Sequence, residues 1–222
     1  MNQNIEKFKN SDSLTNWVKY FIYIQIFVAI IALASNFMEY QLLSDYQNGV
    51  YTSQEQAVAD GEASDKRQQI ISIFFLVTFV ISGILILKWI YRANYNARQL
   101  GAQNMEFTPG WSIGWYFIPI FTLWKPYQAM KEIWKASHEP NDWGSAKTSS
   151  ILGWWWFFWI VTNAIGNVSF RLAKSADELN ELISLNLINQ ASEILSIPLA
   201  IVTLLLITRI YSAQLKHAQE NS

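Results

Sequence analysis

Residues 108–137 read TPGWSIGWYFIPIFTLWKPYQAMKEIWKAS, an apolar stretch that leads directly into a basic helix. Residues 107–124 carry no charge, which alone would suit a membrane span. Four residues in this run favour turns or break helices: Pro109, Gly110, Gly114 and Pro119. Such breaks free backbone N–H and C=O groups that lipid cannot satisfy. The sequence therefore predicts a re-entrant or interfacial segment over residues 107–137, which enters the membrane interface without crossing the bilayer.

Long uncharged runs elsewhere in the chain predict four transmembrane helices. Residues 20–38, 68–87 and 148–170 contain no charged residue and no histidine. Each reaches the roughly 20 residues that span about 30 Å of hydrocarbon. Residues 194–215 contain only Arg209, close enough to the end to extend to the headgroups. We expect an all-α integral membrane protein, a single domain over 1–222, with two span pairs flanking the central segment. The expected spans cover about 17–38, 68–90, 149–170 and 194–214.

The positions of lysine and arginine predict the topology. If residues 107–124 do not cross, twelve of these cations lie on the cytoplasmic side and four outside. If the segment crosses, the count becomes eight on each side. The positive-inside rule favours four spans with both termini cytoplasmic. The external loops are then residues 39–67 and 171–193, although five spans remain the alternative.

The first span raises the question of a cleaved signal. Lys7, Lys9 and Lys19 precede an apolar run that contains Ala32-Leu33-Ala34, which resembles a signal-peptidase site. The uncharged run continues through Phe37, so an uncleaved anchor is the favoured interpretation.

No residue pattern in the chain identifies a reaction. The absence of cysteine excludes disulfides and thiolate nucleophiles, and the common hydrolase and nucleotide-binding motifs are absent. His138 and His217 are the only histidines, and neither has ligand spacing to a second one. We expect both histidines, and the nearby Glu132, to be exposed to solvent. The sequence therefore predicts no enzyme activity, no metal site and no cofactor.

Polar residues within the predicted spans are candidates for an intramembrane function. They include Gln25 in the first span and Asn163 and Asn167 in the third. The two asparagines share a helix face, where they either line a polar cavity or bond to neighbouring helices.

The basic helix after Trp124 offers a second candidate surface. Pro126 suits the first turn of a helix, and the apolar residues Tyr127, Met130 and Trp134 recur at helical spacing. Polar and charged residues occupy the other face, as expected for an amphipathic helix at an interface. The candidate residues for binding lipid or a partner are Lys125, Lys131, Trp134 and Lys135.

The central motif closely resembles that of the bacterial multi-pass membrane proteins grouped as domain of unknown function 4328. The matching residues are Pro109, Gly110, Gly114, Trp115, Phe117, Pro119, Lys125, Pro126, Trp134 and Ser137. The resemblance extends over about residues 20–214 and implies a bacterial inner membrane protein. It brings no established activity or catalytic residue. We expect no proline-rich or zinc-ribbon-like leader of the kind found on some relatives, nor a function tied to one.

We therefore expect a non-enzymatic membrane protein that binds lipid or protein at its cytoplasmic face. Membrane lipids with anionic headgroups, a protein partner or a second copy of the chain are the expected partners, and nucleic acid is not. The alternative is a small transporter or channel subunit with a path beside the broken segment.

The topology can be checked by cysteine labelling, because the chain has no cysteine of its own. A cysteine at Ser53 or Ser184 should react with an impermeant thiol reagent added from outside, whereas one at Ser145 should not. Outside labelling at residue 145 would support five spans.

Overall fold

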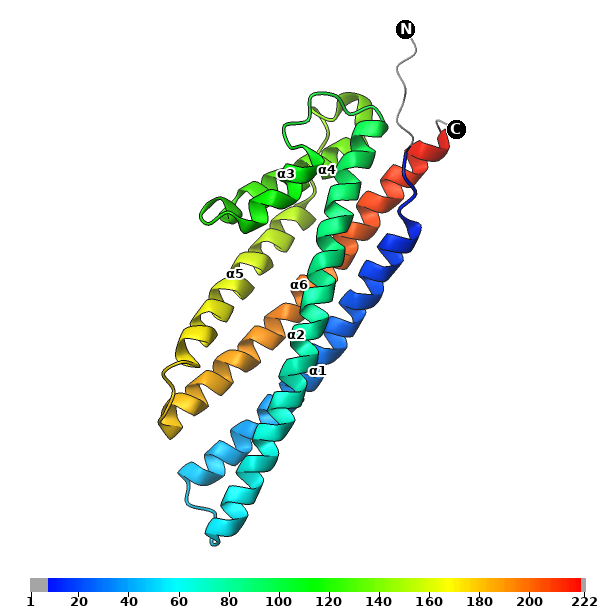
Figure 1. The fold of residues 1–222 in the computed structure, drawn as a ribbon. Coiled ribbons are helices and arrows are strands. Elements are labelled where there is room, and N and C mark those ends of the chain that lie inside the picture. Colours follow the sequence, from blue (N-terminus) through cyan, green and yellow to red (C-terminus); the bar gives the residue numbers. More distant parts are fainter. Residues whose placement is uncertain (1–7, 221–222) are drawn as a thin grey trace. The chain divides into compact units, whose positions relative to one another are not determined.

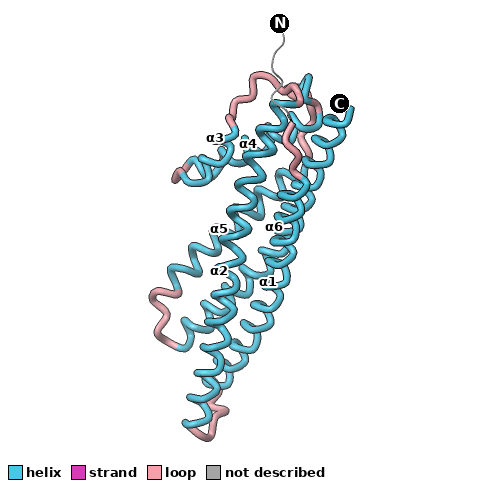
Figure 2. The backbone as a smooth tube through the Cα atoms, turned by 45° about the vertical axis from the view of Figure 1, so that its right-hand side comes forward, coloured by secondary structure: helices cyan, strands magenta, loops and turns pink. Residues whose placement is uncertain are grey.

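A computed structural model describes residues 8–220, and every regular element among them is a helix (Figures 1 and 2). This confirms the all-α prediction for the described residues. Lys7, one of the predicted cytoplasmic cations, lies outside them. The α-helices are α1 (Asp12–Gln47), α2 (Gln54–Gln99), α3 (Pro109–Gly114), α4 (Lys125–His138), α5 (Ser150–Leu172) and α6 (Leu179–Glu220). Short 3-10 turns form η1 (Trp115–Phe117), η2 (Phe121–Leu123) and η3 (Pro140–Asp142).

Three of these helices, α1, α2 and α6, are long and apolar enough to cross a membrane. Helix α5 coincides with the predicted span 149–170 but is not among the three. Its four tryptophans and its two asparagines, Asn163 and Asn167, rank low on hydropathy scales. The structure therefore supports three candidate spans by length and composition.

The helices extend well beyond the predicted spans. Only residues 48–53 separate α1 from α2, and α6 runs without a break through Pro198. Residues 54–67, at the start of α2, are rich in Gln, Ala and Glu, which are good helix formers, so the helix continues past its apolar part. At 1.5 Å per residue, the 46 residues of α2 reach about 70 Å, more than twice the hydrocarbon thickness. If α2 spans a membrane, part of it therefore lies outside the hydrocarbon.

The sequence predicts one membrane domain, and within it the packing separates two compact units. Among the described residues, unit 1 comprises 8–22, 81–156 and 201–220, and unit 2 comprises 23–80 and 157–200. The central segment belongs wholly to unit 1.

Unit 1 has a core in which buried polar side chains connect the helices. Trp89 of α2 donates its indole N–H to the hydroxyl of Thr15 in α1, at 3.1 Å. The buried amide of Gln214 in α6 donates to the carbonyl of Ala93 in α2 and to the hydroxyl of Ser137 in α4, both at 2.8 Å. These bonds hold α4 against the ends of two long helices.

Gly101 ends helix α2 and turns the chain toward the central segment. Its φ of 113° lies in the region that favours glycine. The N–H of Gly101 bonds to the carbonyl of Arg98, and the N–H of Ala102 bonds to that of Ala97, both at 3.2 Å. This is the Schellman pattern, which satisfies carbonyls at the end of a helix.

The central segment folds into a hairpin, residues 108–138, in which α3 contacts α4 (Figure 1). Thr108 caps α3 by accepting the N–H of Trp111 at 3.2 Å, and Pro109 is the first helical residue. Pro119 separates η1 from η2, and Ile120 after it has a positive φ of 70°. The chain then enters α4 at Lys125.

Unit 2 is also joined by polar contacts among its helices. Asn186 of α6 donates to the carbonyl of Asn36, at 3.0 Å, and to the carboxylate of Glu39, at 2.8 Å, both in α1. Gln68 of α2 donates to the same Glu39 carboxylate at 2.8 Å. Glu39 therefore links three helices within this unit.

Replacing Gly114 by leucine should destabilise the hairpin more than replacing Ile113 by leucine. A Cβ atom at Gly114 would lie 3.1 Å from the indole ring of Trp111, so a larger side chain must displace that ring. Such overpacking costs about 1–3 kcal/mol, whereas an isoleucine-to-leucine change usually costs less than about 1.5 kcal/mol. Thermal unfolding of the detergent-purified variants measures the difference. Equal melting temperatures would contradict this account of Gly114.

Candidate functional site

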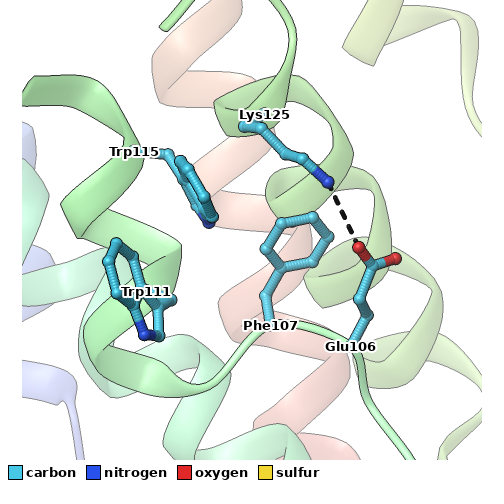
Figure 3. A pocket seen from close by; sticks show the side chains of 5 residues that line it. All are labelled: Glu106, Phe107, Trp111, Trp115 and Lys125. Carbon is cyan, nitrogen blue, oxygen red and sulfur yellow. Dashed lines mark hydrogen bonds and ion pairs between the residues drawn. The ribbon is translucent and has the colours of Figure 1, made fainter. Parts of the chain in front are cut away.

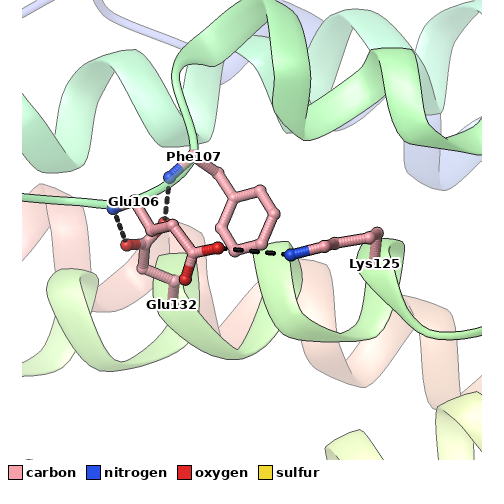
Figure 4. Close-up of polar contacts among 4 residues, drawn as sticks. All are labelled: Glu106, Phe107, Lys125 and Glu132. Atoms are coloured by element: carbon pink, nitrogen blue, oxygen red, sulfur yellow. Dashed lines mark hydrogen bonds and ion pairs between the residues drawn. The ribbon is translucent and has the colours of Figure 1, made fainter. Parts of the chain in front are cut away.

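The segment between α2 and α3, residues 100–108, has no regular secondary structure, and side chains from both sides hold it. The carboxylate of Glu132 in α4 accepts the backbone N–H groups of Glu106 and Phe107, the latter at 3.0 Å (Figure 4). From α2, Asn94 donates to the carbonyl of Phe107 at 2.9 Å, and Arg98 donates to the same carbonyl at 2.9 Å. The backbone N–H and C=O groups between the two helices thus bond to side chains, whereas in a helix or a sheet they would bond to other backbone groups.

Glu132 lies in a buried environment, so the predicted exposure of this residue is wrong. Only 6% of it is accessible to solvent, because the polar side of α4 here meets the backbone of residues 106 and 107. Burial raises the pKa of the Glu132 carboxyl above its ordinary value. The two backbone N–H groups and the nearby Arg98 act in the opposite direction, since they favour the ionised form.

We call the bonds of Glu132, Asn94 and Arg98 to the backbone of residues 106 and 107 the clamp. Beside the clamp lies a cavity of about 130 Å³, lined by Glu106, Phe107, Trp111, Trp115 and Lys125 (Figure 3). The ammonium group of Lys125 lies 3.2 Å from a carboxylate oxygen of Glu106. It also lies 5.1 Å from the centre of the Phe107 ring and 5.8 Å from that of Trp115. In Figure 3, the ring of Phe107 stands between this ion pair and the two indole rings. The cavity therefore combines one cation, one carboxylate and three aromatic walls.

Aromatic contacts continue from the cavity along the hairpin. The ring centres of Trp111 and Trp115 are 4.9 Å apart, those of Trp115 and Phe121 5.2 Å, and those of Phe121 and Trp124 5.4 Å. The outer end of the hairpin exposes large apolar side chains to an unusual degree, with Phe117 70% and Ile120 69% accessible. We call this end the apolar tip, residues 117–124.

The structure does not bring the four candidate binding residues of the basic helix together. Lys125 lines the cavity, and Lys131 is half-buried on α4. Lys135 donates to the carbonyl of Gly144 at 3.1 Å. Trp134 is only 6% accessible and stacks on His138 with ring centres 4.1 Å apart, so its indole packs inside unit 1.

The two histidines, predicted to be exposed to solvent, are half-buried. One ring nitrogen of His217 lies 3.0 Å from the carbonyl oxygen of His138, and the other lies 3.2 Å from the carboxylate of Glu220. The contact with His138 joins the end of α6 to the end of α4. Within residues 8–220 there is no group of three or more histidine, aspartate or glutamate residues that could hold a metal ion.

The remaining motif residues have different surroundings. An added Cβ at Gly110 would meet nothing within 4 Å, in contrast to Gly114. Pro119 is exposed in the turn of the hairpin, and Pro126 is buried in the first turn of α4.

The candidate intramembrane polar residues lie in unit 2. Asn163 donates to the carbonyl of Trp159 at 2.7 Å, and Asn167 donates to that of Asn163 at 2.8 Å. Both asparagines are exposed and bond within their own helix, and Gln25 is half-buried in α1. None of the three lines the cavity.

A second cavity, of about 470 Å³, lies among the loops of unit 1. Its lining residues are Gly101, Gln103, Asn104, Asn141, Asp142, Trp143 and Gly144. The indole N–H of Trp143 donates to the carbonyl of Gln103 at 2.8 Å, which joins the loop after α2 to the loop after η3. The lining is mainly polar backbone and amide, with Asp142 as its one carboxylate.

Sequence reasoning missed Asn94, Arg98, Glu132 and Glu106. The spacing of Asn94 and Arg98 was a usable signal, because residues four apart share a helix face and Arg98 bonds to Asn94 at 3.2 Å. Glu106 gave no signal, since its role depends on the ion pair with Lys125, 19 residues away.

Replacing Glu132 by leucine should lower the free energy of unfolding by about 2 kcal/mol or more, because two backbone N–H groups lose their acceptor. The same change at Glu139, an exposed residue at the end of α4, should cost less than about 0.5 kcal/mol. Denaturation in detergent, followed by tryptophan fluorescence, compares the two. Similar losses at both positions would show that the clamp does not stabilise unit 1.

Comparison with known proteins gives one result that covers most of the chain. No curated protein and no solved structure matches. The family model described as Domain of unknown function (DUF4328) matches residues 53–212, which include the clamp, the cavity and the hairpin. The chain therefore belongs to the DUF4328 family.

Proposed function

We propose that this chain is a non-enzymatic membrane protein of four spans that uses its hairpin, residues 108–138, to bind lipid at the cytoplasmic interface. Both termini lie in the cytoplasm in this proposal, and the membrane is the inner membrane of a bacterium. The apolar tip enters the interface, and the cations of α4 meet anionic headgroups.

Exposed apolar surface supports the membrane location. The apolar part of α2 is almost entirely accessible in the isolated chain, and Phe74 and Leu76 are 62% and 61% accessible. Soluble monomers rarely expose apolar area on this scale, whereas a lipid-facing helix must do so. The three candidate spans carry such side chains.

Helix α5 supplies the fourth span. It has 23 residues, and its first charged residue is Arg171, at its last turn. Tryptophans gather near its start, as is typical of an anchor at the membrane interface. With four spans, the positive-inside rule favours cytoplasmic termini and a cytoplasmic hairpin.

The observation that carries the lipid proposal is the apolar tip beside a cationic helix. Phe117 and Ile120 are the most exposed apolar residues of the hairpin. Lys125 and Lys131 follow them closely in the chain, at the start and in the middle of α4. Apolar side chains in the acyl boundary with cations at headgroup level are the usual arrangement of interfacial helices. Each such cation near an anionic surface contributes about 1 kcal/mol.

The transporter alternative has less support. A polar path would need Asn163 and Asn167 to face a wet cavity, whereas both amides bond to carbonyls of their own helix. That pattern is a common way for polar side chains to lie on an apolar helix.

Reversing the charge of Lys131 and Lys135 together, to glutamate, should weaken retention of anionic lipid at least tenfold. The expected factor follows from about 1 kcal/mol for each cation and from the repulsion that each glutamate adds. Lipid that stays with the purified protein, measured by mass spectrometry, gives the readout. Added salt should weaken retention in the unmodified protein as well.

The matched control reverses Lys66 and Lys174, which lie in unit 2 in the segments proposed to be outside. The net charge changes equally, so retention should stay near that of the unmodified protein. If both double variants retain anionic lipid normally, α4 has only a packing role, and a protein partner becomes the favoured occupant of the hairpin.

A further inference from the structure

We infer that the cavity between Glu106 and Trp111 binds a headgroup carrying both a phosphate and a primary ammonium, of the phosphoethanolamine type. The inference rests on the proposed function, because a lipid must reach the hairpin from the bilayer. It goes further by naming the chemistry of the ligand and the residues that select it.

The charges that line the cavity favour a zwitterion. Lys125 and Glu106 are 3.2 Å apart, and their side chains are 22% and 69% accessible. Water screens the Glu106 end of this pair, so the carboxylate can turn away from Lys125 at little cost to admit a ligand. A lone anion would meet the carboxylate of Glu106, and a lone cation would meet the ammonium of Lys125. A ligand with one charge of each sign can satisfy both side chains.

The aromatic walls suit the ammonium end of such a ligand. The ammonium of Lys125 already lies within 6 Å of two ring centres, at Phe107 and Trp115. That is the distance at which the face of an aromatic ring attracts a cation. The ring of Phe107, next to Glu106 in the chain, is therefore the wall placed to receive the ammonium of a ligand, and Trp111 closes the far side of the cavity.

The carboxylate of Glu106 distinguishes a primary from a quaternary ammonium. Only one of its oxygens takes part in the bond to Lys125. A primary ammonium can donate hydrogen bonds to the other oxygen, and a quaternary ammonium has none to donate. The site therefore favours ethanolamine over choline.

The size of the cavity admits a small polar group. Its volume of about 130 Å³ is well above the roughly 10–15 Å³ that one water molecule requires. It lies at the base of the hairpin, next to the apolar tip, where Phe117 and Ile120 are exposed. Acyl chains attached to a headgroup in the cavity can lie along this tip.

The test measures binding of short-chain phospholipids to the detergent-purified full chain by native mass spectrometry. Dihexanoyl phosphatidylethanolamine should bind at least tenfold more tightly than the phosphatidylcholine and phosphatidylglycerol of the same chain length. Free phosphoethanolamine should compete, but only at higher concentration, because it lacks the acyl contacts. If it binds as tightly as the lipid, the ligand is a soluble molecule, and the lipid source is wrong.

Glu106→Gln is the decisive variant, because it removes one charge from a largely exposed side chain. It should weaken phosphatidylethanolamine at least tenfold and strengthen phosphatidylglycerol, since Lys125 loses its competing carboxylate. Lys125→Gln should weaken all three lipids. Glu139→Gln, an exposed carboxylate outside the cavity, serves as the control and should change none of them. An unchanged preference for ethanolamine in Glu106→Gln would overturn the inference.

The failure of this inference can be told apart from the failure of the proposed function. Reversing Lys131 and Lys135 leaves every lining residue of the cavity in place. If that double variant retains anionic lipid while Glu106→Gln abolishes the ethanolamine preference, the cavity binds the headgroup and the cations of α4 do not bind anionic lipid. The reverse result supports the α4 surface and excludes the cavity.

Discussion

The carboxylate of Glu132 accepts two successive backbone N–H groups, those of Glu106 and Phe107, and the geometry of the candidate site depends on this contact. It fixes the irregular chain against α4 at the point where the hairpin begins. Phe107 thereby presents its ring to the cavity, and Glu106 comes within reach of Lys125 at 3.2 Å. Burial disfavours the ionised form of this carboxyl, and the two backbone N–H groups favour it.

The clamp also explains why the chain can leave regular structure between α2 and α3. Backbone N–H and C=O groups that lie away from water require partners. Here α2 supplies donors, the amide of Asn94 and the guanidinium of Arg98, while α4 supplies the acceptor. The donors and the acceptor come from opposite sides of one short segment. The packing of unit 1 here thus depends on three polar side chains, Asn94, Arg98 and Glu132.

The helices could be predicted from the sequence more readily than the candidate site. Uncharged runs indicate helices, and α1, α2 and α6 are long and apolar enough to span a membrane. Their ends were harder to predict, because residues such as 54–67 are polar yet favour helix, and hydropathy marks only the apolar part. The tryptophans of α5 lower its hydropathy, although tryptophan is common at membrane interfaces. Hydropathy therefore understates how well α5 suits a membrane.

The residues of the candidate site show the limit most clearly. Lys125 was identified from the basic helix, but its partner Glu106 lies 19 residues earlier, beyond any helical spacing. Glu132 has the sequence features of an ordinary surface residue, because helical periodicity separates two faces and does not reveal that the backbone of residues 106 and 107 covers one of them. Helical spacing places Trp134 on the apolar face of α4 with Met130, and both are buried, but the stacking of Trp134 on His138 could not be read from that spacing.

The contact between Gly114 and Trp111 has a consequence for the shape of the cavity. The ring of Trp111 fills the space beside the glycine and is also a wall of the cavity. A larger residue at 114 would shift that wall and resize the cavity, while Lys125 and Glu106 kept their charges. The volume of the cavity and its charges therefore depend on separate positions in the chain.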